Sequence, residues 1–265
     1  MPRIIGWVGV IALVAIIAAW IWMQRGQPQL ELTEPPATET PAPPPTAEAE
    51  PKIQFPVPPV VTEKPLPPLD GSDRQLREAL SDLGAEPGWL EKAVFEDFVR
   101  RVVATVDSLT TEKIPLRLLP VKTAPGKLMT AVDAEGIRLQ SENSARYRPY
   151  MRAVAAIDAK RLVALYIEYY PLFQQAYQEL GYPKGYFNDR LIAVIDHLLA
   201  TPEVTEPVRL VQPKVMYQFA DPEMEARSAG QKALMRMGNA NAAVVKEKLR
   251  AIRRELVGFR PAGSS

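Results

Sequence analysis

Hydrophobic residues recur every three or four positions from residue 159 to residue 180, which places them along one face of a helix. Pro171 falls inside this pattern. Because the register continues across the proline, we predict one kinked helix rather than two separate helices. Gly181 predicts the end of the helix through a left-handed backbone conformation. The apolar positions are Leu162, Leu165, Tyr166, Tyr169, Leu172, Phe173, Ala176, Tyr177 and Leu180.

A second helical pattern follows directly and ends before Pro202. Asn188 is a favourable N-cap residue, and Asp189 lies in the first turn, where the helix dipole favours a carboxylate. At about 100° per residue, Asp189 and Asp196 lie on the polar face of this helix. The two helices predict an αα-hairpin joined through residues 181–187. The apolar face comprises Phe187, Leu191, Val194, Ile195, Leu198 and Leu199.

Shorter helical patterns flank this hairpin on both sides. Ser72 and Gln75 have the spacing of a capping box, and Pro87 is a favourable first residue for a helix that continues to Leu109. Towards the C-terminus, Asp221 followed by Pro222 predicts a helix start. The last two helices are predicted to start at residue 228, where a second capping box begins, and at Asn239 or Asn241.

The segment 114–143 has a different pattern, because three prolines prevent a long helix there. Apolar stretches on both sides of residues 133–136 predict a β-hairpin over residues 127–140, with Gly136 in the left-handed position of the turn. Residues 203–221 predict a long ordered loop, with a short strand at 208–211 as the alternative. The predicted fold class is mainly α: a single helical domain of six to eight helices with one small β-hairpin.

The N-terminus predicts a membrane anchor. Residues 4–23 carry no charge and are long enough, at about 30 Å, to span a bilayer core. Trp7 and Trp20 lie near the two ends, as is typical of interfacial anchoring, and the absence of a small-residue cleavage site favours an uncleaved helix. Arg3 favours a cytoplasmic N-terminus, residues 1–3, and a location of the remaining chain in the bacterial periplasm. The lipid bilayer is therefore one predicted partner, through residues 4–23.

Residues 24–68 predict a disordered, proline-rich linker, because they hold 14 of the 27 prolines of the chain. The linker is interpreted either as a tether that extends the reach of the domain or as a spacer of no particular length. The helical domain is expected at residues 69–260, followed by a short tail at 261–265.

Composition excludes several functions. The formal net charge of +1 gives no indication of a nucleic-acid partner. The absence of cysteine excludes disulfides, thiolate metal sites and cysteine nucleophiles. The sequence contains no phosphate-binding loop, dinucleotide fingerprint, nucleophile elbow or metal-binding histidine pair, so no cofactor is predicted.

One hypothesis is catalytic. His197 is the only histidine and follows Asp196, an arrangement that could orient a general base. Together with Asp189 these residues define a candidate hydrolase site. The two carboxylates would be about 10 Å apart along a helix axis, at the upper limit for an inverting pair. The alternative is a solvated polar face with a histidine near the helix C-terminus.

A second hypothesis is a surface for a peptide or a glycan. Tyrosines cluster with arginines in two predicted turns, and tyrosine gives a large contact area at a low cost in entropy. The alternative is that these tyrosines fix the turns to the core. The candidate residues are Arg146, Tyr147, Arg148, Tyr150, Tyr182 and Tyr186.

Several segments resemble a known family. The stretches at 103–109, 162–166, 170–177, 186–191, 196–202, 217–222 and 230–238 are similar to DUF3014, a proteobacterial family of unknown function, and the resemblance extends over about residues 69–256. It implies one anchor, a proline-rich spacer and a helical domain, and it implies no activity. Because the sequence lacks a recognisable nucleophile, metal set or phosphate loop, the expected function is a non-catalytic envelope scaffold or adaptor that binds an envelope protein or the cell wall. The alternative is a membrane-tethered hydrolase acting through Asp189, Asp196 and His197.

Overall fold

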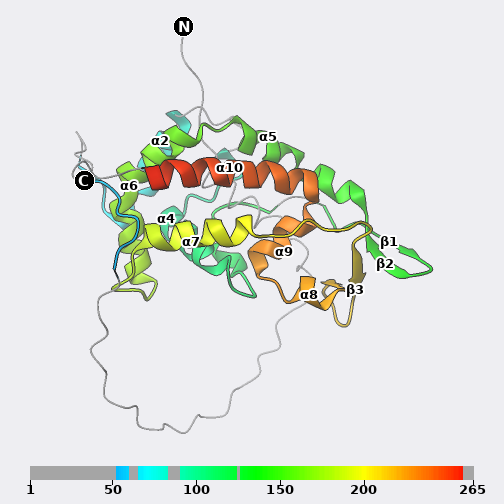
Figure 1. Cartoon of the computed structure of the whole chain (residues 1–265). Coiled ribbons are helices and arrows are strands. Elements are labelled where there is room, and N and C mark those ends of the chain that lie inside the picture. The colour runs from blue at the N-terminus through cyan, green and yellow to red at the C-terminus, as the bar shows by residue number, and fades with distance from the viewer. Residues whose placement is uncertain (1–51, 60–64, 83–89, 124–125, 259–265) are drawn as a thin grey trace, which may run out of the picture.

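The computed structural model describes residues 52–59, 65–82, 90–123 and 126–258. Four helices pack around a shared core at its centre, and a small antiparallel sheet lies at one end (Figure 1). This arrangement confirms the predicted mainly α fold. The membrane helix predicted at 4–23 and the linker up to residue 51 lie outside the described residues. None of the helices in the described part of the chain combines the length and apolar composition that a membrane span requires.

Helix α6 (Ala159–Glu179) is the longest helix among the described residues. Asp158 caps it by accepting a hydrogen bond from the Arg161 amide at 2.9 Å. The helix continues through Pro171, as predicted, and the chain leaves it at Gly181 with a φ of 123°. Its apolar face packs against α4 (Phe98–Ser108) and α10 (Asn239–Gly258).

Helix α7 (Phe187–Leu199) completes the predicted αα-hairpin but begins two residues earlier than the predicted cap implies. Tyr186 occupies the N-cap position. The prediction that Asn188 caps the helix is wrong, because this side chain is buried and hydrogen-bonds to Tyr166 and to the backbone of Phe55.

Helix α4 is shorter than predicted. The chain forms an isolated bridge between Ala93 and Val121, and the Val94 amide donates to the carbonyl of Pro120, so α4 begins only at Phe98. Asp97 precedes it with a φ of 54°. The Asp73 carboxylate at the start of α2 (Asp73–Asp82) accepts hydrogen bonds from the amides of residues 97 and 98, both at 2.9 Å. Pairing between distant segments thus overrides the helical spacing that begins at Leu90; Pro87 itself lies outside the described residues.

The predicted hairpin is present as β1 (Thr130–Asp133) and β2 (Gly136–Leu139), with Gly136 at a φ of 110°. It belongs to a four-stranded antiparallel sheet with β3 (Arg209–Val211) and β4 (Gln218–Phe219), in the order β1-β2-β3-β4. The structure thus selects the strand alternative for residues 208–211. A small second core connects this sheet to the C-terminal part of the chain through Val204, Val208, Leu210, Phe219 and Met235.

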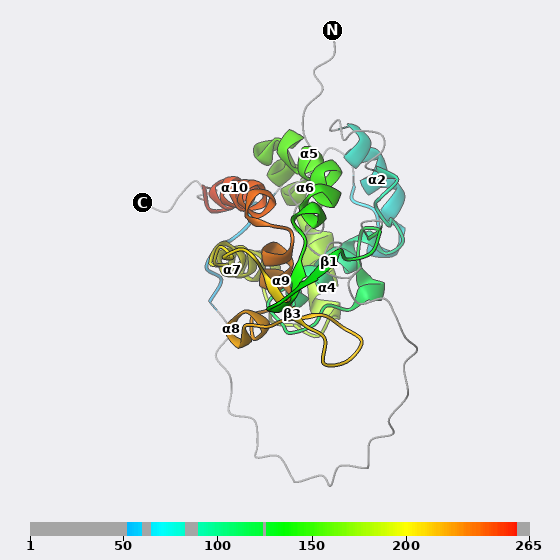
Figure 2. The same ribbon diagram turned by 90° about the vertical axis from the view of Figure 1, so that its right-hand side faces the viewer.

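The remaining helices cover the core and the sheet end (Figure 2). Asp221 and Ser228 cap α8 (Pro222–Glu225) and α9 (Ala229–Arg236), as predicted. Gly238 ends α9 with a φ of 85°. The other elements are α5 (Arg148–Ala156) and the 3-10 segments η2 (Leu69–Gly71), η3 (Leu116–Leu118) and η4 (Ser141–Tyr147).

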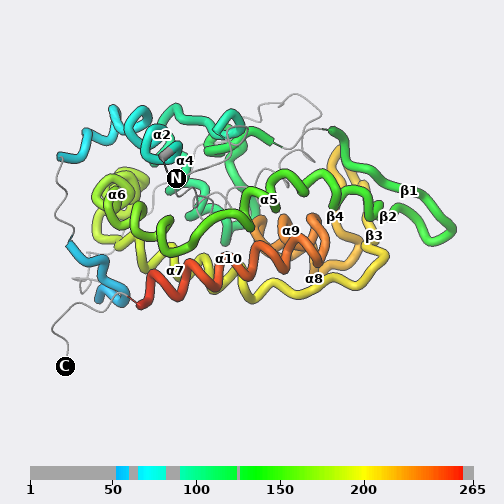
Figure 3. The backbone as a smooth tube through the Cα atoms, turned by 90° about the horizontal axis from the view of Figure 1, so that it is seen from above, coloured from blue at the N-terminus to red at the C-terminus, as the bar shows by residue number. Residues whose placement is uncertain are grey.

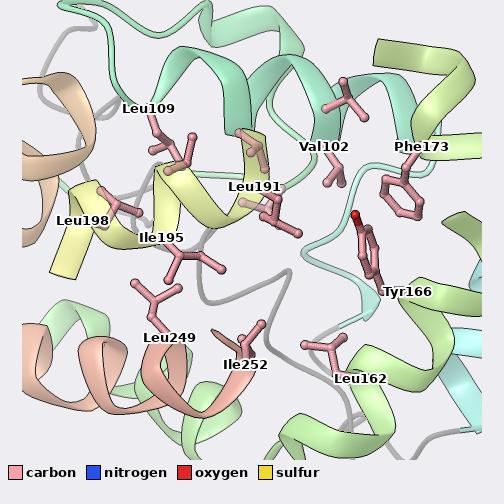
Figure 4. Close-up of a cluster of buried hydrophobic side chains, with 14 of the residues drawn as sticks. Val102, Leu109, Leu162, Tyr166, Phe173, Leu191, Ile195, Leu198, Leu249 and Ile252 are labelled. Carbon is pink, nitrogen blue, oxygen red and sulfur yellow. The ribbon is translucent and has the colours of Figure 1, made fainter. Parts of the chain in front are cut away.

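Figure 4 shows how the central helices meet. Tyr166 and Phe173 of α6 face Val102 of α4, and Ile195 of α7 lies opposite Leu249 of α10. All five side chains are at most 5% exposed. Burying a large apolar side chain of this kind contributes about 1.5–3 kcal/mol to stability, so the contact between these helices holds α7 and its N-terminus in place.

Candidate functional site

Residues 52–59, which belong to the predicted linker, lie against the beginning of α7. Figures 1 and 3 place this segment at the end of the molecule where α7 begins and α10 ends. Phe55 and Val57 are partly buried against the main core. The sequence predicted that the folded domain starts at Leu69. In the structure the packed part of the chain begins earlier, with Phe55 and Val57.

Three prolines determine which backbone groups this segment has available. Residues 56, 58 and 59 are prolines and have no backbone N–H group. The backbone donors between residues 54 and 59 are therefore those of Gln54, Phe55 and Val57. The amides of Gln54 and Phe55 donate to the two oxygens of the Asp189 carboxylate at 2.9 and 2.8 Å. The Val57 amide donates to the Tyr186 hydroxyl at 2.8 Å. Every N–H group in this stretch is thus bound by a side chain of the domain.

Asn188 binds a backbone carbonyl of the segment, that of Phe55. Its Nδ2 donates to the Phe55 carbonyl at 2.8 Å, and its Oδ1 accepts from the Tyr166 hydroxyl at 3.2 Å. Asn188 is 1% exposed, and burial raises the pKa of Tyr166 well above its ordinary value. Tyr166 therefore remains a neutral donor, which orients the Asn188 amide towards the segment.

The turn that carries Tyr186 is held by Gln174 of α6. Gln174 Oε1 accepts from the Phe187 amide at 2.9 Å and from the Tyr170 hydroxyl at 2.8 Å, and Nε2 donates to the Gly185 carbonyl at 2.7 Å. The rings of Tyr170 and Tyr186 are 5.5 Å apart between centroids. Tyr186 is thus held in place by contacts with α6 that do not involve residues 52–59.

A groove of about 400 Å³ continues from the bound segment. Ile53 lies at its edge with 49% of its surface exposed, and Gln178 and the turn residues 183–186 form its other walls. Lys184 provides a cationic side chain there. The surface has room for contacts beyond those that residues 52–59 make.

The six tyrosine and arginine residues predicted to share a surface do not converge. The turn at 146–150 lies towards the sheet, whereas the α6–α7 turn lies at the opposite end (Figure 1). Tyr147 and Tyr150 are 3% and 4% exposed, because they form part of the core that holds α5. Arg146 donates to the carbonyls of residues 126 and 127, and Arg148 is exposed.

The other two predicted residues lie in or next to the α6–α7 turn, and one of them, Tyr186, contacts the bound segment. Tyr186 is half-buried and accepts the Val57 amide. Tyr182 is 41% exposed, and its hydroxyl donates to Asp107 Oδ2 at 3.0 Å. Arg190 Nε donates to the other Asp107 oxygen at 2.7 Å, so this cluster connects the end of α4 to α7.

The three residues of the hydrolase hypothesis have separate partners. Asp189 binds the amides of residues 54 and 55, whereas Asp196 pairs with Arg253, with Oδ2 at 2.9 Å from Nη2. His197 Nε2 lies 2.8 Å from Ser228 Oγ. Burial and the nearby Arg190 and Arg227 lower the pKa of His197. Within the described residues no three acidic or histidine side chains are grouped closely enough to hold a metal ion.

The sequence contained a signal for the bound segment that the compositional prediction missed. Phe55 and Val57 are apolar residues in a linker otherwise rich in proline and acidic residues. Apolar side chains alternating with prolines are typical of extended segments that dock on a folded surface.

The comparisons with known proteins confirm the family that the sequence resembles, over a shorter range of residues. A family model described as "Protein of unknown function (DUF3014)" matches residues 98–253, which include α4, the sheet and the α6–α7 hairpin. No curated protein and no solved structure matches the chain.

Proposed function

We propose that this chain, which belongs to the DUF3014 family, is a non-catalytic, membrane-anchored adaptor of the bacterial envelope whose domain binds an extended peptide at the start of α7. The observation that carries the proposal is how residues 52–59 are held. Each of the four hydrogen bonds goes to a main-chain atom of the segment. A surface that binds backbone atoms accepts any extended segment with the same spacing of free N–H groups, and its apolar contacts add selectivity.

In the resting chain this surface is occupied by the chain's own residues 52–59. A segment of a partner protein exchanges with residues 52–59 when it has the same chemistry. That chemistry is two free N–H groups followed by proline and flanked by apolar side chains. The chain's own segment has the advantage of being tethered, which corresponds to an effective concentration in the millimolar range for a short flexible linker. A partner therefore binds when it presents its segment at high local concentration, as in an assembled envelope complex.

The location is part of the same proposal. Residues 4–23 supply the apolar length of an inner-membrane anchor, and Arg3 favours a periplasmic domain. With residues 52–59 bound to the domain, the free tether consists of residues 24–51. This is about 90 Å in a fully extended polyproline conformation, compared with about 140 Å for residues 24–68. An envelope protein or the cell wall within this distance is the proposed partner.

C-terminal fusions to alkaline phosphatase and to a fluorescent protein test the location. We expect active phosphatase and a dark fluorophore, because the phosphatase needs the oxidising periplasm to form its disulfides. A silent phosphatase together with a fluorescent cytoplasmic reporter contradicts the proposed orientation.

The hydrogen bonds and ion pairs of Asp189, Asp196 and His197 support the non-catalytic assignment. A general base needs an open approach to a substrate proton, whereas both carboxylate oxygens of Asp189 accept backbone amides and both oxygens of Asp196 pair with Arg253. His197 lies beside Ser228, the residue that caps α9. These contacts fasten one element of the fold to another.

A peptide added in trans tests the binding function. In the full chain, Phe55→Pro with Val57→Pro removes two of the three donors and both apolar side chains, which frees the surface. A labelled peptide of residues 52–59 is then expected to bind this variant saturably in a fluorescence anisotropy titration. Adding Asp189→Asn weakens this binding about 10-fold or more, because one acceptor oxygen is replaced by a donor.

Asp196→Asn is the matched control. It removes the same charge from the same helix, but its carboxylate faces Arg253 and not the segment, so peptide affinity is expected to stay unchanged. If the freed variant keeps its helical circular dichroism and binds no peptide, residues 52–59 are a fixed part of the fold and the proposal is wrong. Equal affinities with and without Asp189→Asn contradict the assigned binding residues.

A further inference from the structure

A cavity of about 350 Å³ lies at the sheet end of the molecule, away from residues 52–59. Strand β2 and η4 form one wall, the loop at 204–208 forms another, and the end of α9 closes it. This volume lies in the range typical of small-molecule sites. Its apolar lining includes Leu139, Val208 and Met235, and its charged lining includes Arg138, Glu206 and Arg236.

Two buried cations of α9 share one carboxylate next to this cavity. Lys232 and Arg236 are one turn apart, and both side chains are 5% exposed. Lys232 Nζ lies 2.9 Å from Glu225 Oε1, and the Phe219 amide donates to Oε2 at 2.9 Å. Arg236 Nη2 is 3.8 Å from the same Oε2. The two oxygens of Glu225 lie closer to Lys232 Nζ and to the Phe219 amide than to Arg236. Glu225 therefore compensates the charge of Arg236 only in part.

The guanidinium of Arg236 is also short of hydrogen-bond acceptors. Nη2 donates to the Tyr217 carbonyl at 3.2 Å, and the group lies over the Phe219 ring at 4.7 Å from its centroid. Nε is buried and has no hydrogen-bond partner in the described part of the chain. An unsatisfied buried donor on a charged group is costly, and burial lowers the pKa of Arg236 to about 10.

We propose that this cavity binds a small organic carboxylate, with Arg236 as the residue that pairs with its carboxyl group and Arg138 as a second cation at the rim. A carboxylate supplies both a negative charge and a planar pair of acceptors, which matches the fork geometry of a guanidinium. The apolar wall requires an apolar body on the ligand. A single negative charge matches the one cation that Glu225 compensates only in part, and Glu206 in the cavity lining disfavours a doubly charged phosphate.

A titration of the full chain with benzoate tests this inference. Benzoate combines a carboxylate with an apolar ring, benzamide is its neutral isostere, and inorganic phosphate is the alternative anion. We expect saturable binding of benzoate by NMR, with amide shifts at Ser144, Val208 and Gly238. Benzamide and phosphate are expected to bind about 10-fold more weakly or worse.

Two variants locate the site. Arg236→Gln is expected to abolish benzoate binding. Because this residue is buried and its replacement can unfold the sheet end, Arg138→Gln provides a second test at a side chain that is 41% exposed, with an expected loss of several-fold in affinity. Arg152→Gln, an exposed arginine of α5 outside the cavity, is the control with unchanged affinity. Equal binding of benzoate and benzamide, or benzoate affinity unaffected by Arg138→Gln, overturns the proposal.

Discussion

A single glycine determines how closely α9 approaches the ends of α4 and α7. The Gly230 amide donates to the Leu109 carbonyl at 3.0 Å. A Cβ atom at this position would lie 2.8 Å from that carbonyl oxygen and 2.7 Å from Cδ2 of Leu198. The first of these atoms belongs to the backbone and cannot move aside without shifting the end of α4.

Gly230→Ala is therefore expected to destabilise the protein by about 1–3 kcal/mol, the range typical of overpacked cores. Helix propensity alone predicts the opposite sign, a gain of up to about 1 kcal/mol. Gly258→Ala is the control, since a Cβ there meets no atom within 4 Å. Urea unfolding followed by circular dichroism measures both variants. Equal or greater stability of Gly230→Ala contradicts the close contact.

At the residue scale the sequence predicted local roles well and distant roles poorly. Asp221 and Ser228 cap helices as predicted, because a cap needs only the neighbouring backbone. Asp189 was recognised as a favourable first-turn carboxylate, but its partners are about 135 positions away in the sequence. Local spacing contains no information about such a partner.

At the scale of elements, hydrophobic periodicity predicted the α6–α7 hairpin and the β1–β2 hairpin within a few residues. It failed for the segment before Phe98. There the amide of Val94 pairs with Pro120 and Asp73 binds the amides that open α4, so contacts with distant segments decide where the helix begins. Strand β4 was missed for a similar reason, since two residues form a strand only when a neighbouring strand is present.

At the scale of the whole molecule, the two proposed sites lie at opposite ends. Residues 52–59 bind where α7 begins, whereas the cavity beside Arg236 is lined by β2, which lies at the other end of the molecule (Figure 1). The proposed anchor would tether the chain through residues 52–59 and leave its sheet end facing away from the tether. The sequence analysis assigned the two Tyr/Arg turns to one surface. In the structure these turns lie at the two opposite ends, so this part of the layout was not predicted. Tyr186, a candidate binding residue from the sequence, accepts the Val57 amide of the chain's own segment, and its contact with a partner stays a prediction.

Asp189 holds residues 54 and 55 on the domain, and amide hydrogen exchange in the full chain measures this contact directly. We predict that the amides of Gln54 and Phe55 exchange at least about 10-fold more slowly than in an unstructured peptide, because a charged acceptor stabilises each bond. Asp189→Asn is expected to remove most of this protection, and Asp196→Asn is expected to retain it. Exchange of both wild-type amides at the rate of the unstructured peptide contradicts the account.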